Sequence, residues 1–342
     1  MEKELISIIM PVYNNENTVS ETIDSVLRQE YKNFELIIVD NGSTDKSKEI
    51  IKMKSDKRIK LYELDEPNVS NARNFGISKS IGQYVMFIDA DDTLELNALC
   101  ILINIFKEYN PNAIIFDYYK CLKNIKEKQQ LLYKSGVKNK NFIMNSIIPD
   151  LISTKVWGSV WRLIVNKSIL DNNNLKFNEN VKVAEDLLFN IELFCCLDNV
   201  YILNECLYNY NVNYNSTLNK YKSNNLIIND FFQKELKAIL QKMHIYEANI
   251  QYYKLNRIVM YTSSISNAVR NKKIADMYKE IKTIVKIFEE DNLDYNQTKP
   301  KFLIRVTLKM LQYKNIVLLM LLYKIKENIR LKKCKKEKCN EQ

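Results

Sequence analysis

The sequence predicts an α/β fold in the first part of the chain and an α-helical region in the last part. Between residues 6 and 118, short apolar runs alternate with helical segments, which is the pattern of βαβ units. Beyond Ser223, apolar residues recur with the spacing of one helix face. The chain has 342 residues, of which 46% are hydrophobic, so it is long enough for one large domain and an appendage.

The first part contains five runs of strand character, at residues 6–12, 34–39, 59–64, 84–88 and 113–116. Thr18 and Glu21 form a capping-box pattern after the first run, so we expect the first helix to begin at Thr18 with its side chain as the cap. A second helix is expected near residues 94–109, and Ser70 is expected to precede a helix that Asn71 opens. A further strand-like stretch covers residues 200–210.

The helical region is expected to begin near Asn224 and to end in a basic amphipathic segment at residues 302–329. The longest uninterrupted apolar run there, 316–323, is shorter than the roughly 20 residues that span a bilayer. The pattern is typical of a helix that lies on a membrane surface. A helix packed on the protein itself, or on a second copy in a homo-oligomer, fits equally well.

The net charge is +10, and much of the excess lies in residues 324–338. This distribution favours a contact between the C-terminal end and an anionic surface. The aromatic residues are not interleaved with the basic ones there as on a single-strand platform, so we expect no nucleic-acid partner.

The cysteines and the single histidine exclude several kinds of site. The seven cysteines include no Cys-x-x-Cys pair, and His244 lies far from any other candidate residue. We therefore expect neither zinc nor disulfides, and His244 is interpreted as structural. The N-terminal apolar stretch is too short for a signal peptide, so we expect a cytoplasmic protein with reduced thiols.

Polar residues follow three of the predicted strands directly. Because ligands bind beyond the carboxyl ends of strands in open α/β sheets, these residues are expected to converge on one crevice. They are Tyr13, Asn14 and Glu16 after the first strand, Asp40 after the second, and residues 89–92 after the fourth. The turn after the first strand contains no glycine, which excludes a dinucleotide site of the glycine-rich type.

The segment Asp89-Ala90-Asp91-Asp92 carries three carboxylates at a strand end. Mg²⁺ and Mn²⁺ prefer oxygen ligands and are often shared between one or two carboxylates and substrate phosphates. The alternative is a local turn or a helix cap. From this segment alone both interpretations stay open, and in the second Asp92 is the residue expected to cap the following helix.

Four motifs, PVYN, VDNGSTD, ARN and DADD, occur in this order between Pro11 and Asp92. The order resembles the N-terminal half of the inverting glycosyltransferases of family 2. The resemblance continues through VWGSVWRLIVNKSIL and AEDLLF, at residues 156–170 and 184–189. It implies a GT-A fold, in which a Rossmann-like mixed sheet has helices on both faces, followed here by the α-helical appendage.

The same resemblance implies how the chain is divided. Residues 1–223 would form the catalytic domain, with a donor half at about 1–120 and an acceptor half at about 121–223. Residues 224–342 would form the helical region with its basic amphipathic tail.

The resemblance assigns a donor site for a nucleotide sugar and a divalent metal, Mn²⁺ or Mg²⁺, at Asp91 and Asp89. Asp40 would accept a hydrogen bond from the base, and a carboxylate suits the imide N–H of uracil, so a UDP-sugar is expected. The residues expected to line this site are Pro11, Val12, Tyr13, Asn14, Glu16, Asp40, Asn71, Arg73, Asp89, Ala90 and Asp91.

The acceptor side is assigned in the same way. Asp186 would be the base that removes the proton of the acceptor hydroxyl, and Glu185 would orient the acceptor. Trp157, Trp161 and Arg162 would form the acceptor floor, although family members often have lysine at the position of Arg162. Without the resemblance, acids in a first helical turn and buried aromatics are ordinary structural features.

The expected function is an inverting, metal-dependent transfer of a hexose or N-acetylhexosamine from a UDP-sugar to a saccharide. The acceptor is expected to be lipid-linked, at the inner face of the cell membrane, in the synthesis of a surface polysaccharide such as a capsule. One alternative is a sugar nucleotidyltransferase, which would need a basic, glycine-rich triphosphate loop that is absent after Val12. The other is a non-enzymatic, membrane-associated interaction protein.

Overall fold

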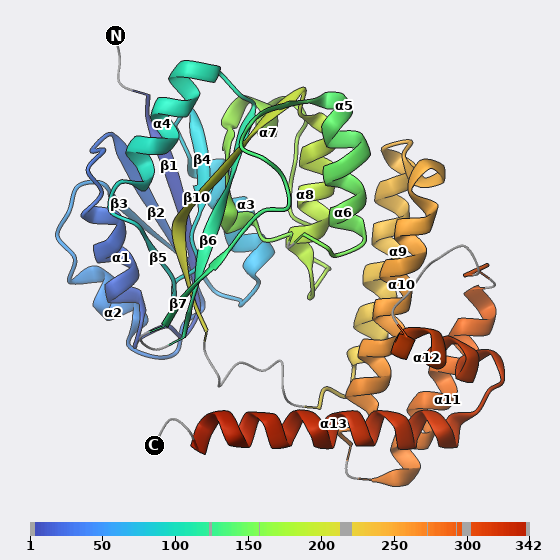
Figure 1. The fold of residues 1–342 in the computed structure, drawn as a ribbon. Helices are drawn as coiled ribbons and strands as arrows, with labels where there is room; N and C mark the ends of the chain where they lie inside the picture. Colours follow the sequence, from blue (N-terminus) through green and yellow to red (C-terminus); the bar gives the residue numbers. More distant parts are fainter. Residues whose placement is uncertain are drawn as a thin grey trace. The chain divides into compact units, whose positions relative to one another are not determined.

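A computed structural model describes residues 4–122, 125–156, 158–212, 221–271, 273–291, 293–295 and 302–339, the last nine of these by their backbone alone. The chain divides into two compact units, Met1–Tyr214 and Asn215–Gln342 (Figure 1). Each unit is described by itself.

The first unit is built on one mixed sheet, in which the described strands have the order β3-β2-β1-β4-β9-β6-β10-β5 (Figure 1). The pairs β1–β2, β1–β4, β2–β3 and β6–β10 are parallel. The strands on this path are β1 (Ile6–Val12), β2 (Phe34–Asn41), β3 (Ile59–Leu64), β4 (Tyr84–Phe87), β5 (Thr93–Leu94), β6 (Ala113–Leu122), β9 (Leu163–Asn166) and β10 (Asn199–Asn211). Two further strands pair at the side, β7 (Ile125–Gln129) with β6 and β8 (Gly136–Asn139) with β10.

Helices cover both faces of this sheet, as expected (Figure 1). The apolar residues of α1 (Val19–Leu27) and α4 (Ala98–Tyr109) pack against alternate residues of β1 and β2, including Ile8 and Leu36. On the other face, α3 (Val69–Lys79) lies against β1 and β2, and Phe189 of α8 (Glu185–Cys196) packs edge to face on Phe87. The remaining helices of this unit are α2 (Ser47–Lys52), α5 (Lys140–Phe142), a π-helical turn (Ile143–Ile147), α6 (Ile148–Ile152), a 3₁₀ turn (Val160–Arg162) and α7 (Lys167–Asn172).

A strand from the predicted acceptor half lies in the middle of the sheet. Strand β9 pairs antiparallel with β4 on one side and with β6 on the other. Its sequence, LIVN, is short and follows a 3₁₀ turn. It shows no alternation of apolar and polar residues that would predict a strand. Residues from both halves therefore belong to one hydrogen-bonded sheet.

Most predicted strands occur where expected, and several boundaries differ. Strands β1 and β3 match the predicted ranges, whereas β6 extends to Leu122 because it pairs along its length with β7 and β10. Helix α4 begins at Ala98 and not near Leu94, because Thr93 and Leu94 pair with β10. Helix α3 begins at Val69, and its cap is Asn68, whose side chain accepts a hydrogen bond from the Asn71 N–H at 3.2 Å.

The predicted capping box at Thr18 is wrong in its interaction but right in its position. Thr18 does stand before the first residue of α1, yet its side chain caps no helix N–H. Its hydroxyl instead donates to the carbonyl of Ala90 at 2.9 Å. A long-range partner has taken the hydroxyl that the local pattern assigned to the helix.

The second unit contains the helices α9 (Asn225–Lys242), α10 (Tyr246–Ala268), α11 (Ile274–Asp291), α12 (Phe302–Gln312) and α13 (Ile316–Cys339). The expected single C-terminal segment is two helices, because Lys314 adopts a left-handed conformation between α12 and α13. A buried cluster that includes Tyr261, Ile281, Leu311 and Leu319 joins α10 to α13. Along the described part of the chain, no helix is both long and apolar enough to cross a membrane.

The close approach of α3 to β1 depends on Gly76. A Cβ atom at this position would lie 2.3 Å from Cγ2 of Ile9, which is fully buried. We predict that Gly76→Val lowers the free energy of unfolding by about 1–3 kcal/mol, because the stiff Ile9 side chain cannot move away. Urea denaturation measures the effect. Ser78→Val, at an exposed position of the same helix, is the control and should change stability by less than about 0.5 kcal/mol.

Candidate active site

Hydrogen bonds join the segments that follow β1 and β2. The Asn14 carboxamide oxygen accepts from the Thr44 N–H at 2.8 Å, and the Glu16 carboxylate accepts from the Lys46 N–H at 3.0 Å. Asn14 reaches this position with a left-handed backbone, which asparagine tolerates better than most residues. Beside them, Tyr13 is 46% exposed, while Pro11 and Val12 are buried at the end of β1.

Asp40 is the penultimate residue of β2 and has one carboxylate oxygen without a hydrogen bond from any described residue. The residue is 1% exposed, and its Oδ2 accepts a hydrogen bond of 3.3 Å from the Ser43 N–H. The other oxygen, Oδ1, is buried and accepts no hydrogen bond within the described part of the chain. Since an unsatisfied buried acceptor costs about 1–3 kcal/mol, Oδ1 is suited to a donor brought by a ligand.

One arginine connects three of the predicted site segments. The guanidinium of Arg73, which is 4% exposed, lies 3.2 Å from Asp89, 3.1 Å from Glu185 and 2.5 Å from Asp186. The three carboxylates raise the pKa of Arg73 against the opposing effect of its burial. The guanidinium therefore stays charged and holds α3, the end of β4 and the start of α8 together.

The residue before α8 has a strained backbone conformation. Ala184, directly before Glu185, has φ 57° and ψ 31°, which is the left-handed region. An L-residue pays roughly 1–2 kcal/mol for this conformation. This strained residue directly precedes Glu185 and Asp186, whose carboxylates contact the Arg73 guanidinium.

Asp186 is held at both carboxylate oxygens. Oδ1 binds Arg73, and Oδ2 accepts from the Val160 N–H at 3.2 Å. Burial raises the pKa of Asp186, and Arg73 opposes this only in part because Glu185 and Asp89 share the same cation and raise the pKa further. The side chain remains 19% exposed, so a hydroxyl group can still reach it.

The backbone of the acidic segment is fixed from two sides. On one side, the hydroxyls of Thr18, just before α1, and Thr22, within it, both donate to the carbonyl of Ala90, at 2.9 and 3.0 Å. From β10, the Tyr208 hydroxyl accepts from the Asp89 N–H at 3.1 Å, and the Asn211 side chain donates to the Asp91 carbonyl at 2.8 Å.

The interpretation of Asp92 as a helix cap is wrong. Asp92 is fully buried, and its carboxyl accepts from the Tyr208 hydroxyl and from the Asn211 N–H, both at 2.7 Å. Helix α4 begins six residues later, with Asn97 at the cap position. Burial and the neighbouring carboxylates of Asp89 and Asp91 raise the pKa of Asp92 to about 9. Its carboxyl, bonded at both oxygens, therefore serves as a buried anchor for the segment.

The donor set at Asp89 and Asp91 fits a divalent cation that substrate oxygens complete. Burial, followed by the charge of Asp89, raises the pKa of Asp91, as expected for two carboxylates that lie close together. Within the described residues, no three acidic, histidine or cysteine side chains gather tightly enough to hold a metal by themselves. A cation shared between one or two carboxylates and a diphosphate does not need such a cluster.

Two of the predicted acceptor residues are buried. Trp161 is 3% exposed and stacks on Tyr208, with ring centroids 4.5 Å apart. Arg162 is 5% exposed, lies over the ring of Tyr118 and donates to the Phe116 carbonyl at 3.3 Å. Trp157 lies outside the described residues. The roles of these three residues in acceptor binding stay predictions.

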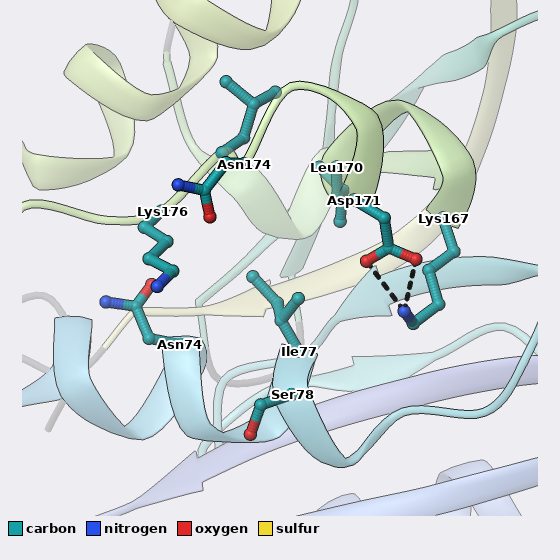
Figure 2. A pocket seen from close by; sticks show the side chains of 9 residues that line it. Asn74, Ile77, Ser78, Lys167, Leu170, Asp171, Asn174 and Lys176 are labelled. Carbon is teal, nitrogen blue, oxygen red and sulfur yellow. Dashed lines mark hydrogen bonds and ion pairs between the residues drawn. The ribbon is translucent and has the colours of Figure 1, made fainter.

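A separate hollow of about 290 Å³ lies between α3 and α7 (Figure 2). Lys167 and Asp171 form an ion pair at one side, and Lys176 extends toward Asn74 at the other (Figure 2). None of the predicted site residues lines this hollow. The candidate active site is the group of predicted site residues that the structure brings together around Arg73.

The sequence pattern of "Glycosyl transferase family 2" matches residues 7–160. The chain is 33% identical over 249 residues to poly(ribitol-phosphate) beta-N-acetylglucosaminyltransferase TarP of Staphylococcus aureus (strain N315), covering 71% of this chain and 74% of TarP. This chain belongs to glycosyl transferase family 2. It is also 31% identical over 229 residues to the uncharacterized glycosyltransferase EpsJ of Bacillus subtilis (strain 168), covering 62% of each protein.

The fold of this glycosyltransferase is similar to that of S. aureus TarS. A crystal structure of TarS residues 1–349 in complex with UDP-GlcNAc has a TM-score of 0.70 to this chain at 18% identity, covering 94% of this chain and 91% of that one. The expected GT-A fold with a helical C-terminal region is thereby confirmed. Family membership also decides for a glycosyltransferase over the two alternative functions.

Sequence reasoning missed the residues that hold the acidic segment. Thr22, Tyr208 and Asn211 carry no motif, and Ala184 has no sequence signal for a left-handed backbone. Among the residues that hold this segment, Thr18 alone was singled out in the sequence, and it was interpreted there as a helix cap. The polar residues of the predicted strand at 200–210 could have suggested Asn211, which follows it directly, as a candidate. They could not have shown that Asn211 bonds to Asp91.

The Tyr208 hydroxyl should be essential for the stability of this segment. We predict that Tyr208→Phe lowers the free energy of unfolding by about 1–3 kcal/mol, because Asp92 Oδ2 loses a donor and the Asp89 N–H loses an acceptor. Tyr118→Phe is the control, since its ring also packs on Trp161 without bonding to residues 89–92. Urea denaturation of both variants measures the difference, and equal losses would contradict the assignment.

Proposed function

We propose that this glycosyltransferase transfers N-acetylglucosamine from UDP-GlcNAc, with inversion at the anomeric carbon, to a surface polymer or its lipid-linked precursor. The observation that carries the proposal is the ion-pair group in which one guanidinium holds Asp89 of the donor side and Asp186 of the acceptor side. Within the family's broad range of sugars, the name of TarP and the ligand in the TarS structure support this donor.

The unpartnered oxygen of Asp40 supports a uracil base. In the proposal, Oδ1 accepts the imide N–H of uracil, which cytosine lacks at the same ring position. Tyr13 is exposed at the end of β1, where its ring can cover the base. Glu16, Asn14 and Asn71 complete the walls of this donor site, together with Pro11 and Val12.

Asp186 is proposed as the catalytic base. As the acceptor hydroxyl attacks the anomeric carbon from the face opposite the diphosphate, its proton passes to a carboxylate oxygen of Asp186, the bond to UDP breaks, and the electron pair leaves with UDP. Val160 and Arg73 fix the orientation of the carboxylate. Glu185, on the same side of Arg73, is proposed to orient the acceptor.

Metal dependence is part of the proposal. Asp91 and Asp89 would hold Mn²⁺ or Mg²⁺ together with the diphosphate oxygens, and the cation would offset the charge that develops on the leaving UDP. The bonds from Thr18, Thr22, Tyr208 and Asn211 would keep the two carboxylates in place.

The acceptor and the location of the reaction are further parts of the proposal. The name of TarP refers to poly(ribitol phosphate), which is an anionic polymer. We therefore favour an anionic surface polymer as the acceptor. Trp157, Trp161 and Arg162 are proposed to contribute to its binding. The reaction would take place in the cytoplasm at the inner face of the membrane, and a homo-oligomer formed through the C-terminal helices is an alternative to membrane contact.

The central test compares donor binding with turnover in Asp186→Asn. With Mn²⁺ and UDP-GlcNAc, both wild type and variant should show a rise in melting temperature, because Asp186 does not hold the nucleotide. UDP release with poly(ribitol phosphate) as acceptor should fall by about 10²–10⁴-fold in the variant.

The matched control is Asp171→Asn, which removes an acid that pairs with Lys167 outside the crevice. It should keep wild-type turnover. Full activity of Asp186→Asn would show that the base is another residue. A melting-temperature rise with a GDP- or CMP-sugar alone would contradict the role of Asp40.

The raised pKa of Asp186 predicts the pH dependence of the reaction. The base must be charged to accept a proton, so kcat/KM should fall as the pH decreases through a value above the ordinary carboxyl range near about 4. Glu185→Gln removes a neighbouring negative charge that raises this pKa, so the acid limb should move to lower pH. Profiles of kcat/KM against pH for both proteins measure the shift. An unmoved limb would show that a different group titrates.

A further inference from the structure

We propose that helix α13 docks the protein on a bilayer that contains acidic phospholipid, with an apolar stripe in the interface and a cationic cavity beside it for a lipid phosphate. The proposal concerns the second unit alone. It does not depend on the sugar donor or on the acceptor, so its failure would leave the proposed transfer reaction untouched.

The apolar stripe lies on the face of α13 opposite its buried residues. Val317, Leu321, Ile325 and Ile329 follow each other at intervals of four residues and are 53–64% exposed. Leu319 and Tyr323, on the other side of the helix, are 0% and 1% exposed and belong to the core of the unit. One face therefore anchors the helix and leaves a continuous apolar row outside.

The cavity next to this stripe is strongly cationic. It has a volume of about 530 Å³, and its lining includes Arg270 just after α10, and Lys324 and Arg330 on α13. Among the described residues of the lining Glu327 is the single acid, so their positive charges exceed the negative ones by two. Asn328 adds a side-chain amide that can donate to a phosphate oxygen, whereas the Tyr221 hydroxyl in the same lining donates to Glu280.

Glu327 holds the two arginines side by side. Its carboxylate lies 3.2 Å from the Arg270 guanidinium and 2.6 Å from that of Arg330. Two guanidinium groups would otherwise repel each other, so the carboxylate fixes a cationic pair before any ligand arrives. Guanidinium groups bind phosphate oxygens in well-defined geometry, which matches a phospholipid headgroup.

The stripe and the cavity are adjacent on the helix surface. At 3.6 residues per turn, Lys324 and Lys326 lie on either flank of Ile325, roughly 100° away. Lysines on the flanks of an apolar row can extend their ammonium groups to lipid phosphates while their stems cover apolar surface. Lys324 therefore lies at the border that the stripe shares with the cavity.

Charge favours a membrane over a second copy of this chain. From Ile316 to Arg330, α13 carries Lys324, Lys326 and Arg330 against Glu327 alone, and residues 332–338 of the sequence add five lysines and one glutamate. Pairing two such helices along their stripes would bring like charges together. An acidic bilayer supplies the opposite charge over the whole length, at about 1 kcal/mol for each basic residue near its surface.

Vesicle sedimentation of the full chain tests the proposal. The probes are vesicles of phosphatidylcholine mixed with phosphatidylglycerol, and vesicles of phosphatidylcholine alone. Wild type should bind the mixed vesicles more tightly, and added salt should weaken this binding. Leu321→Ser with Ile325→Ser should lower the partition coefficient about tenfold or more, because two partly exposed apolar side chains no longer enter the interface.

The cavity is tested separately by Arg270→Gln with Lys324→Gln. Each lost charge should lower binding to the acidic vesicles about fivefold, with little effect on the neutral ones. Lys324→Gln alone, which removes no partner of Glu327, keeps the test valid if the double variant melts early.

The matched controls carry the same changes elsewhere in the unit. Ile227→Ser with Ile274→Ser alters side chains that are 71% and 64% exposed, and Lys279→Gln with Lys282→Gln alters α11; both pairs should bind like wild type. Equal binding of wild type to the two vesicle types would overturn the proposal. So would an oligomer in light scattering that the Leu321→Ser and Ile325→Ser variant dissociates while its vesicle binding stays unchanged.

Discussion

The geometry of the active site depends on the ion-pair group around Arg73. Three carboxylates meet one guanidinium, one from just after the end of β4 and two from the first turn of α8. Without the Arg73 guanidinium, the partly buried carboxylates of Asp89 and Asp186 would repel each other. Electrostatic attraction thus brings together the residues proposed for the donor side and for the acceptor side. The apolar packing of the sheet only defines the edge at which they meet.

A second layer of neutral hydrogen bonds supports this charged group. Hydroxyl and amide groups hold the backbone of residues 89–92, and the stack of Trp161 on Tyr208 places the holding hydroxyl. Asp92 belongs to this layer because its buried carboxyl accepts from Tyr208 and Asn211. Asp92 thus anchors the segment, and Asp89 and Asp91 are the residues proposed to bind the ligand.

The parts of this structure that were predictable are those whose causes are local. Strand β1 ends where its apolar run ends, and α8 begins at the acids that favour a helix N-terminus. The family resemblance added which acids meet, but not that Arg73 joins them. Thr18 and Asp92 were misread because a cap and a long-range partner have the same sequence signature; their partners lie 72 and 116 residues away. A local sequence pattern cannot predict contacts between residues that lie so far apart in the chain.

Strand β9 has a consequence for how specificity in this enzyme can change. Because Leu163–Asn166 is hydrogen-bonded between β4 and β6, no cut through the sheet separates the proposed donor half from the proposed acceptor half. Exchanging one half with a relative would require two foreign strands to match the register of β9 at once. New sugar or acceptor preferences are therefore more accessible through loop substitutions at the strand ends than through recombination of halves, and chimeras should be designed with β9 kept beside its native neighbours.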